Sequence, residues 1–191
     1  MSFSYVIWRS GVVAHACVLD DLEGVDDQHD LNVGIPRAAG FPGNASFSMS
    51  ADYPRNMVLT DSLVNTDLML VVSLRLQRFL QMRGIEKVEY LPVAILDHKG
   101  KLAGEYFIVH PLEPIDCLDV PSCGATFWSV DPDNIMALKR LAIDFAKIPP
   151  LRELFRPKSF FEVFLVRREL ADAIDAAGFA GIRWVEIDSY P

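Results

Sequence analysis

The sequence predicts an α+β fold, with a mixed, largely antiparallel sheet and a few short helices. The first observation is a strand, helix, glycine and strand pattern that occurs twice, over residues 71–93 and 164–187. The second is a hairpin pattern between residues 88 and 109, which indicates antiparallel pairing. The third is a balance of 51% hydrophobic and 23% charged residues in a chain of 191, which is typical of a globular protein.

We expect a single α+β domain over residues 1–191, because no linker in the sequence is long enough to require a division. Two closely packed lobes, 1–120 and 121–191, are the alternative within that domain. An internal duplication would explain the two strand-helix-strand units. Such units also recur on packing grounds alone, so the sequence leaves both explanations open.

The N-terminal region predicts three short strands and a long loop. Residues 4–8 and 12–19 are rich in aromatic, β-branched and small apolar residues, so both predict strands. Residues 20–44 have little periodicity and contain several glycines, so they predict a long loop of the kind that tends to be functional or mobile. A strand is expected at 45–49 and a turn at 52–56.

The first copy of the repeated unit carries the clearest local signals. Ser73 is a suitable N-cap, because its hydroxyl can accept a hydrogen bond from an amide of the first helical turn. Leu76, Phe79 and Leu80 fall on one helical face, and Gly84 can close the helix in the left-handed conformation.

A hairpin follows this helix. Strands are expected at 88–96 and 103–109, around a tight connection at 97–100. Pro92 lies inside the first strand and cannot donate to a ladder, so we expect an edge or a bulge there.

The C-terminal region is less regular until the second copy. A strand is predicted at 126–130, whereas residues 135–145 fit a helix or a strand equally well. Residues 154–156 and 160–164 predict two extended pieces. The helix of the second copy is expected over 167–177, without the serine cap of the first copy.

The formal charge of −8 argues against nucleic-acid and anionic-membrane partners, since both favour a basic face. An acidic chain suits solubility and encounter with a basic protein, although it need not imply any partner. The longest apolar run, 68–74, is too short to span a bilayer, and Arg9 interrupts the stretch most similar to a secretory signal. The three cysteines form no CxxC pair, which favours a reducing, cytoplasmic location.

The residues predict no catalytic, metal or cofactor site. The sequence lacks GxSxG, GxGxxG and GxxxxGK motifs, and its four histidines show no ligand spacing. Cys123 could act as a nucleophile if His98 or His110 lay beside it. The alternative is an inert packing residue, the more usual role of an unpaired cysteine.

An acidic run is the remaining surface feature. It comprises Asp20, Asp21, Glu23, Asp26, Asp27 and Asp30, with no Lys or Arg between Arg9 and Arg37. We treat it as a candidate protein-binding site that steers a cationic partner; the alternative is a solvated loop. Exposed aromatic anchors would strengthen the first interpretation, and Tyr53, Phe41 and Phe47 are the candidates.

Three short elements carry a family resemblance. They are Val71-Val72-Ser73 before the first helix, Leu154-Phe155-Arg156, and the closing segment 176–184. Together they resemble a family of bacterial immunity proteins from polymorphic-toxin and contact-dependent systems, known as immunity family eleven. Their order and spacing agree over about residues 59–187. One departure is Val166-Arg167, which replaces the valine-serine pair that precedes the final helix in that family.

The resemblance implies a non-enzymatic protein that binds and neutralises a cognate toxin by direct contact. An acidic inhibitor would suit a basic toxin, but the sequence identifies neither the toxin nor the oligomeric state of this chain. Two other functions stay open at this point. One is a small hydrolase or transferase that uses Cys123, and the other is an adaptor that self-associates through an exposed strand containing Pro92 or residues 103–109.

Overall fold

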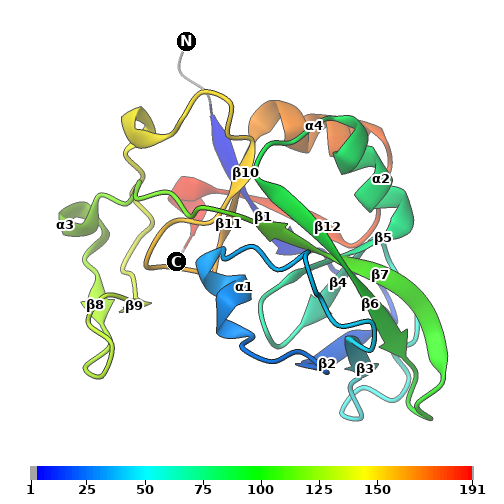
Figure 1. The fold of residues 1–191 in the computed structure, drawn as a ribbon. Helices are drawn as coiled ribbons and strands as arrows, with labels where there is room; N and C mark the ends of the chain where they lie inside the picture. The colour runs from blue at the N-terminus through cyan, green and yellow to red at the C-terminus, as the bar shows by residue number, and fades with distance from the viewer. Residues whose placement is uncertain (1–3, 191) are drawn as a thin grey trace.

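The structure, a computed structural model, describes residues 4–190. Within them the strands form a closed barrel, a separate four-stranded sheet and a two-stranded arm (Figure 1). The barrel contains, in spatial order, β2 (Val18–Glu23), β3 (Ser46–Met49), β6 (Val88–Leu96), β7 (Leu102–Pro111), β5 (Leu70–Ser73) and β4 (Ser62–Asn65). The sheet contains β10 (Leu154–Phe155), β11 (Phe164–Arg167), β1 (Tyr5–Ser10) and β12 (Ile182–Glu186). The arm is formed by β8 (Thr126–Phe127) and β9 (Ile135–Ala137).

Short helices connect these strands. They are α1 (His29–Val33), α2 (Leu74–Met82), α3 (Val120–Cys123) and α4 (Arg168–Ala176), with 3-10 turns η1 (Phe145–Lys147) and η2 (Ile187–Ser189). Among the described strands, β2 with β4 and β3 with β6 are the parallel pairs, and all other pairs are antiparallel. The predicted α+β class, with a mixed, largely antiparallel sheet, is therefore confirmed. In residues 4–190 no helix has the length and apolar character needed to cross a bilayer.

The two strand-helix-strand units share one topology. In the first unit α2 connects β5 to β6, and β7 lies between these strands and is antiparallel to both. In the second unit α4 connects β11 to β12, and β1 lies between them in the same way. The central strand follows the first unit in the sequence but precedes the second. The N-terminal strand thus completes a C-terminal unit.

Both helices begin directly at the end of a strand and end at a glycine. The Ser73 hydroxyl accepts a hydrogen bond from the Leu76 amide, as the capping prediction required. Arg167 at the start of α4 makes no side-chain cap, again as expected. Gly84 and Gly178 follow the two helices with φ of 67° and 68°, the left-handed region that a residue with a Cβ adopts at a cost.

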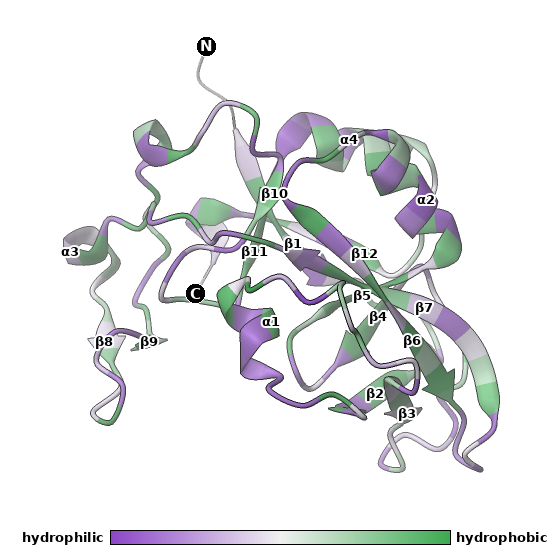
Figure 2. Ribbon diagram, viewed as in Figure 1, coloured by the Kyte–Doolittle hydropathy of each residue, from purple (hydrophilic) through white to green (hydrophobic). Residues whose placement is uncertain are grey.

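Helices α2 and α4 lie side by side (Figure 1), α2 on the barrel strands β5 and β7 and α4 on strands β11 and β1 of the sheet. Their apolar faces, which include Leu76 and Leu170, meet a common cluster with Val6 and Trp8 of β1. Figure 2 shows both helices striped with hydrophobic and hydrophilic residues. Strand β1 also buries Tyr5 and Ile7 in a second cluster on its other face, because alternate residues of a strand point to opposite sides.

The barrel encloses the third apolar cluster, in which Leu19, Phe47 and Ile108 are buried. The predicted hairpin is confirmed as β6 and β7, which pair along the whole of β6. Strand β3 reaches only residues 94–96 of β6. Pro92 therefore has a strand neighbour on one side alone, as an edge position requires.

Arg156, from the Leu-Phe-Arg element, is a buried cation that joins the sheet to the barrel. Its guanidinium donates to Asn32 Oδ1 on α1 at 3.3 Å, to the Leu68 carbonyl at 3.1 Å and to the Phe161 carbonyl. It also lies 4.0 Å from the ring centroid of Phe164. Burial lowers its pKa to about 9, so it keeps its charge at neutral pH. This residue fixes α1 relative to β11.

Two N-terminal predictions were wrong. The second strand does not occupy residues 12–19; β2 begins at Val18 and continues to Glu23. The long loop 20–44 is also interrupted, by the end of β2 and by α1. Leu19 and Leu22 of β2 point into the barrel core. The pairing with β3 shifts register between them, so Asp20 and Asp21 point outward and the strand can contain charged residues. The strand at 45–49 and the turn at 52–56 are confirmed.

Three C-terminal predictions also need correction. The strand at 126–130 shortens to Thr126–Phe127, and the second extended piece does not begin until Phe164. Residues 135–145 are neither one helix nor one strand. After β9 the chain makes separate backbone hydrogen bonds to the segment 117–123. The Lys139 amide donates to the Cys123 carbonyl at 3.1 Å, and the Asp144 amide donates to the Cys117 carbonyl at 2.7 Å. These scattered backbone bonds replace a regular ladder.

Candidate protein-binding surfaces

The acidic run lies along the outside of the barrel, from β2 to the start of α1. Asp20, Asp21, Glu23, Asp26 and Asp27 are exposed, and Asp30 is half-buried. Their charges are not all equally available to a partner. Asp30 forms an ion pair with Arg37 at 2.7 Å, and Asp21 accepts a hydrogen bond from the Thr66 hydroxyl at 2.6 Å.

Asp67 adds a further carboxylate that the sequence did not reveal. It accepts a hydrogen bond from the Leu22 amide at 2.6 Å, because the parallel pairing of β2 and β4 brings the turn after β4 beside β2. Burial raises the pKa of Asp67 above its ordinary value, and the nearby charge of Asp21 raises it further. The hydrogen bond from the Leu22 amide lowers this pKa, but by less. Only the barrel topology, not local spacing, could have placed this residue in the acidic surface.

The three aromatic anchor candidates differ in their surroundings. Tyr53 is 50% exposed, Phe41 is half-buried against the barrel core, and Phe47 is completely buried inside it. Phe47 was therefore a wrong candidate for a surface anchor. On β3, apolar residues alternate with serines, and the apolar side chains face the barrel core. Phe47 is one of these inward-facing residues.

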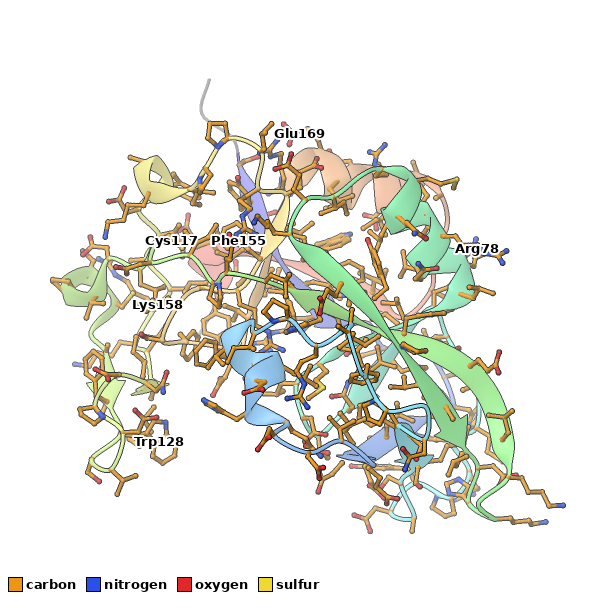
Figure 3. The ribbon with its side chains drawn as sticks, viewed as in Figure 1. Arg78, Cys117, Trp128, Phe155, Lys158 and Glu169 are labelled. Atoms are coloured by element: carbon orange, nitrogen blue, oxygen red, sulfur yellow. The ribbon has the colours of Figure 1, made fainter. Side chains whose placement is uncertain are left out.

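A second candidate surface is the arm, residues 126–137, which projects from the body of the molecule (Figure 1). Phe127 is 41% exposed, Trp128 49% and Val130 89%, and Met136 is exposed as well. Figure 3 shows Trp128 in the outer part of the arm, far from the labelled residues of the core. Large apolar side chains gathered on a projecting hairpin are typical of interaction sites.

The base of the arm is fixed to the protein body. Ile135 is buried in the apolar cluster that contains Tyr5 and Ile7 of β1, and its amide donates to the Ser159 carbonyl at 2.8 Å. The Asp131 carboxylate accepts from the Asn134 side chain at 2.6 Å and closes the turn. A groove of about 320 Å³ separates the arm from α1 and is lined by Val33, Pro114, Asp133, Asn134, Lys158, Ser159 and Phe161. The arm and the helix at the end of the acidic run thus border one groove.

Cys123, the nucleophile considered above, is buried and bonded to the backbone. Its Sγ lies 3.3 Å from the Ala142 amide and 3.5 Å from the Ala142 carbonyl. His98 lies in the turn between β6 and β7, and His110 is buried against α1 with its Nε2 2.8 Å from the Ile35 carbonyl. The hydrogen bonds of Cys123 therefore go to the backbone and not to an imidazole.

A large cleft has Ser122 and Ala142 in its lining but not Cys123. It has a volume of about 750 Å³ and lies beside the edge of the sheet, between Asp119, Arg140, Phe145 and Arg168. Arg168 is paired with Glu186 at 2.5 Å in its wall. Within residues 4–190 no three His, Cys, Asp or Glu side chains gather closely enough to hold a metal ion.

A family model described as an immunity protein family, Imm11, matches residues 26–189. The chain belongs to this family. The match confirms the resemblance seen in the three short elements and extends it, because it starts at residue 26 and not near residue 59. No curated protein matches the chain.

The Imm11 match covers the arm completely and the acidic run only in part. It includes the whole arm, α1 and the acidic residues Asp26, Asp27 and Asp30. It leaves out β1, β2 and the first three residues of the acidic run. Membership in an immunity protein family implies a role without catalysis, which agrees with the position of Cys123.

Proposed function

We propose that this chain binds a cognate bacterial toxin and neutralises it by direct protein-protein contact. The observation that carries the proposal is the Imm11 match over residues 26–189. Immunity by contact requires a rigid surface that a toxin recognises. The closed barrel and the buried core shared by α2, α4 and the sheet provide such a body, and the arm and the acidic run provide exposed features on it.

The proposed toxin is basic on the surface that meets this chain. The formal charge of −8 supports this choice, as does the exposure of most of the acidic run. Opposite charges accelerate diffusional encounter more than they tighten the final complex. We propose the cytoplasm as the site of action, since all three cysteines are buried thiols without a disulfide.

Co-expression tests the proposal. The protein encoded directly upstream of this chain's gene is induced in a host, with and without this chain, and growth and co-purification are scored. We expect the upstream protein to arrest growth when alone, and this chain to restore growth and to co-purify with it. A toxic upstream protein that this chain neither binds nor silences would overturn the proposal.

A further inference from the structure

We propose that the arm, residues 126–137, is the principal contact with the toxin and that it enters an apolar cleft bordered by basic groups. This inference rests on the proposed function and names the surface that performs it. Three observations support it: the exposure of the arm's apolar residues, its fixed base and its charge.

The apolar residues of the arm do not serve the core of this chain. Phe127, the last residue of β8, is 41% exposed, and Trp128, which directly follows the strand, is 49% exposed. Met136 and Ala137 of the paired strand β9 are exposed as well. Val130, at the turn, is 89% exposed. A hairpin that only filled the core would bury these large apolar side chains.

The arm is presented in a defined position. Ile135 is buried, and its amide is bonded to Ser159. At the other end of the arm's base, Cys123 is buried, and its carbonyl accepts from the amides of Lys139 and Arg140 at 3.1 and 3.4 Å. An apolar tip on an anchored base loses less conformational freedom on binding than a flexible loop would lose.

The charge of the arm identifies the occupant. Residues 126–137 include Asp131 and Asp133 but neither Lys nor Arg. In a symmetric dimer the same patch of both subunits meets, so Asp131 and Asp133 would face their own copies. This like-charge contact would be unfavourable, and each chain already carries a formal charge of −8. A cleft with an apolar floor and a basic rim satisfies both the aromatic residues and the carboxylates. Val33 at the end of α1 and Asp133 of the arm line one groove, so the helix that follows the acidic run lies beside the arm.

The experiment measures binding of the upstream-encoded toxin, inactivated by mutation of its own active site, to the full chain by calorimetry or interferometry. The test variant is Trp128→Ala with Val130→Ala. Both side chains are largely exposed, so the fold should persist, which circular dichroism and the melting temperature verify. We expect affinity to fall by at least about 30-fold, the loss typical of truncating central aromatic anchors. Growth rescue should weaken in parallel.

Two matched controls distinguish the outcomes. Leu151→Ala removes an apolar side chain that is 65% exposed in the segment before β10, and Met82→Ala removes one that is 81% exposed on α2. We expect both to bind like the wild type. Wild-type binding that the arm variant retains in full would overturn this inference while leaving the proposed function intact. A wild-type dimer that the arm variant converts to a monomer, with toxin binding unchanged, would also overturn it. Absence of wild-type binding and rescue would instead overturn the proposed function.

Discussion

Asp61 and Arg75 form a two-pronged ion pair that ties together the two strand-helix-strand units. Arg75 Nη2 lies 2.8 Å from Asp61 Oδ2, and Arg75 Nε lies 3.2 Å from Oδ1. The same carboxylate accepts from the Ser73 hydroxyl at 2.7 Å and from the Ala180 amide at 2.9 Å. Arg75 in turn lies 4.1 Å from the centroid of the Phe179 ring. The Asp61 carboxylate thus connects the start of α2, at Ser73 and Arg75, to the segment after α4, at Ala180.

The first prediction concerns Asp61→Asn. The substitution removes the charge but keeps the shape, and we expect it to lower the free energy of unfolding by about 1–2 kcal/mol, because charge-assisted hydrogen bonds at a partly solvated site are lost. Chemical denaturation at pH 7 measures this. Arg78→Ala, at an exposed position on α2, should change stability by less than about 0.5 kcal/mol.

The effect of Asp61 should depend on pH. Burial raises the pKa of this carboxyl, but Arg75, the Ala180 amide and the Ser73 hydroxyl outweigh burial, so the net pKa lies below the usual 3.8. A carboxyl with a lowered folded-state pKa stabilises the protein above its unfolded pKa and loses this contribution as pH falls through the folded value. The difference between wild type and Asp61→Asn should therefore shrink below about pH 4. A constant difference down to pH 2 would contradict this assignment.

The second prediction concerns Gly181, which lies where the sheet meets the barrel. An added Cβ would stand 2.4 Å from the Ser62 carbonyl oxygen and 2.5 Å from Thr60 Oγ1, and φ is +84°. We expect Gly181→Ala to destabilise by more than about 3 kcal/mol, since backbone must move in addition to the conformational cost. Gly178→Ala is the matched control. It has φ of +68° with no atom within 4 Å of the added Cβ, so it should cost about 1 kcal/mol. Equal melting temperatures for the two variants would refute the close contact.

The third prediction concerns the thiols. Burial raises the pKa of Cys17 to about 11 and that of Cys117 to about 12, and Cys123 is completely buried. Because the thiolate is the reactive form, the native protein should show no fast reaction with a chromogenic disulfide reagent at pH 8. All three thiols should react after unfolding in guanidinium. Rapid labelling of native Cys123 would instead revive the enzyme alternative.

The sequence predicted those elements whose signals are local. The cap at Ser73, the glycine stops at Gly84 and Gly178 and the hairpin of β6 and β7 depend on neighbouring residues, and each was found. Strand β2 was misplaced because its outward face is acidic, and charged residues are poor indicators of a strand. The arm was missed as a surface because Phe127, Trp128 and Val130 look like part of a buried strand until their exposure is known.

Long-range features were beyond the sequence for a different reason. Asp67 joins the acidic surface, and Arg156 bonds to Asn32, only because strands distant in sequence pair or pack together. A buried arginine is also unexpected from composition, because charged side chains are seldom buried without a partner. Its acceptors here are an amide oxygen and two backbone carbonyls, which no pattern of residue types indicates.

The last prediction tests steering by the acidic run. The variant Asp20→Asn/Asp21→Asn/Glu23→Gln removes three exposed charges from β2. If these charges guide a basic toxin, the association rate at low salt should fall by about 3- to 10-fold, with little change in the dissociation rate. The dependence of the rate on salt should also become shallower, because fewer charges remain to be screened. Stopped-flow mixing with the inactivated upstream-encoded toxin measures both.

A second triple variant separates a local patch from net charge. Glu86→Gln/Glu169→Gln/Asp172→Asn removes the same number of exposed charges from the helix-bearing part of the protein. At physiological salt, where the screening length is about 8 Å, local steering predicts a smaller change in association rate for this variant than for the β2 variant. Equal slowing by both variants would assign the effect to net charge. No slowing by either would leave the acidic run as a solvated surface and the arm as the determinant of binding.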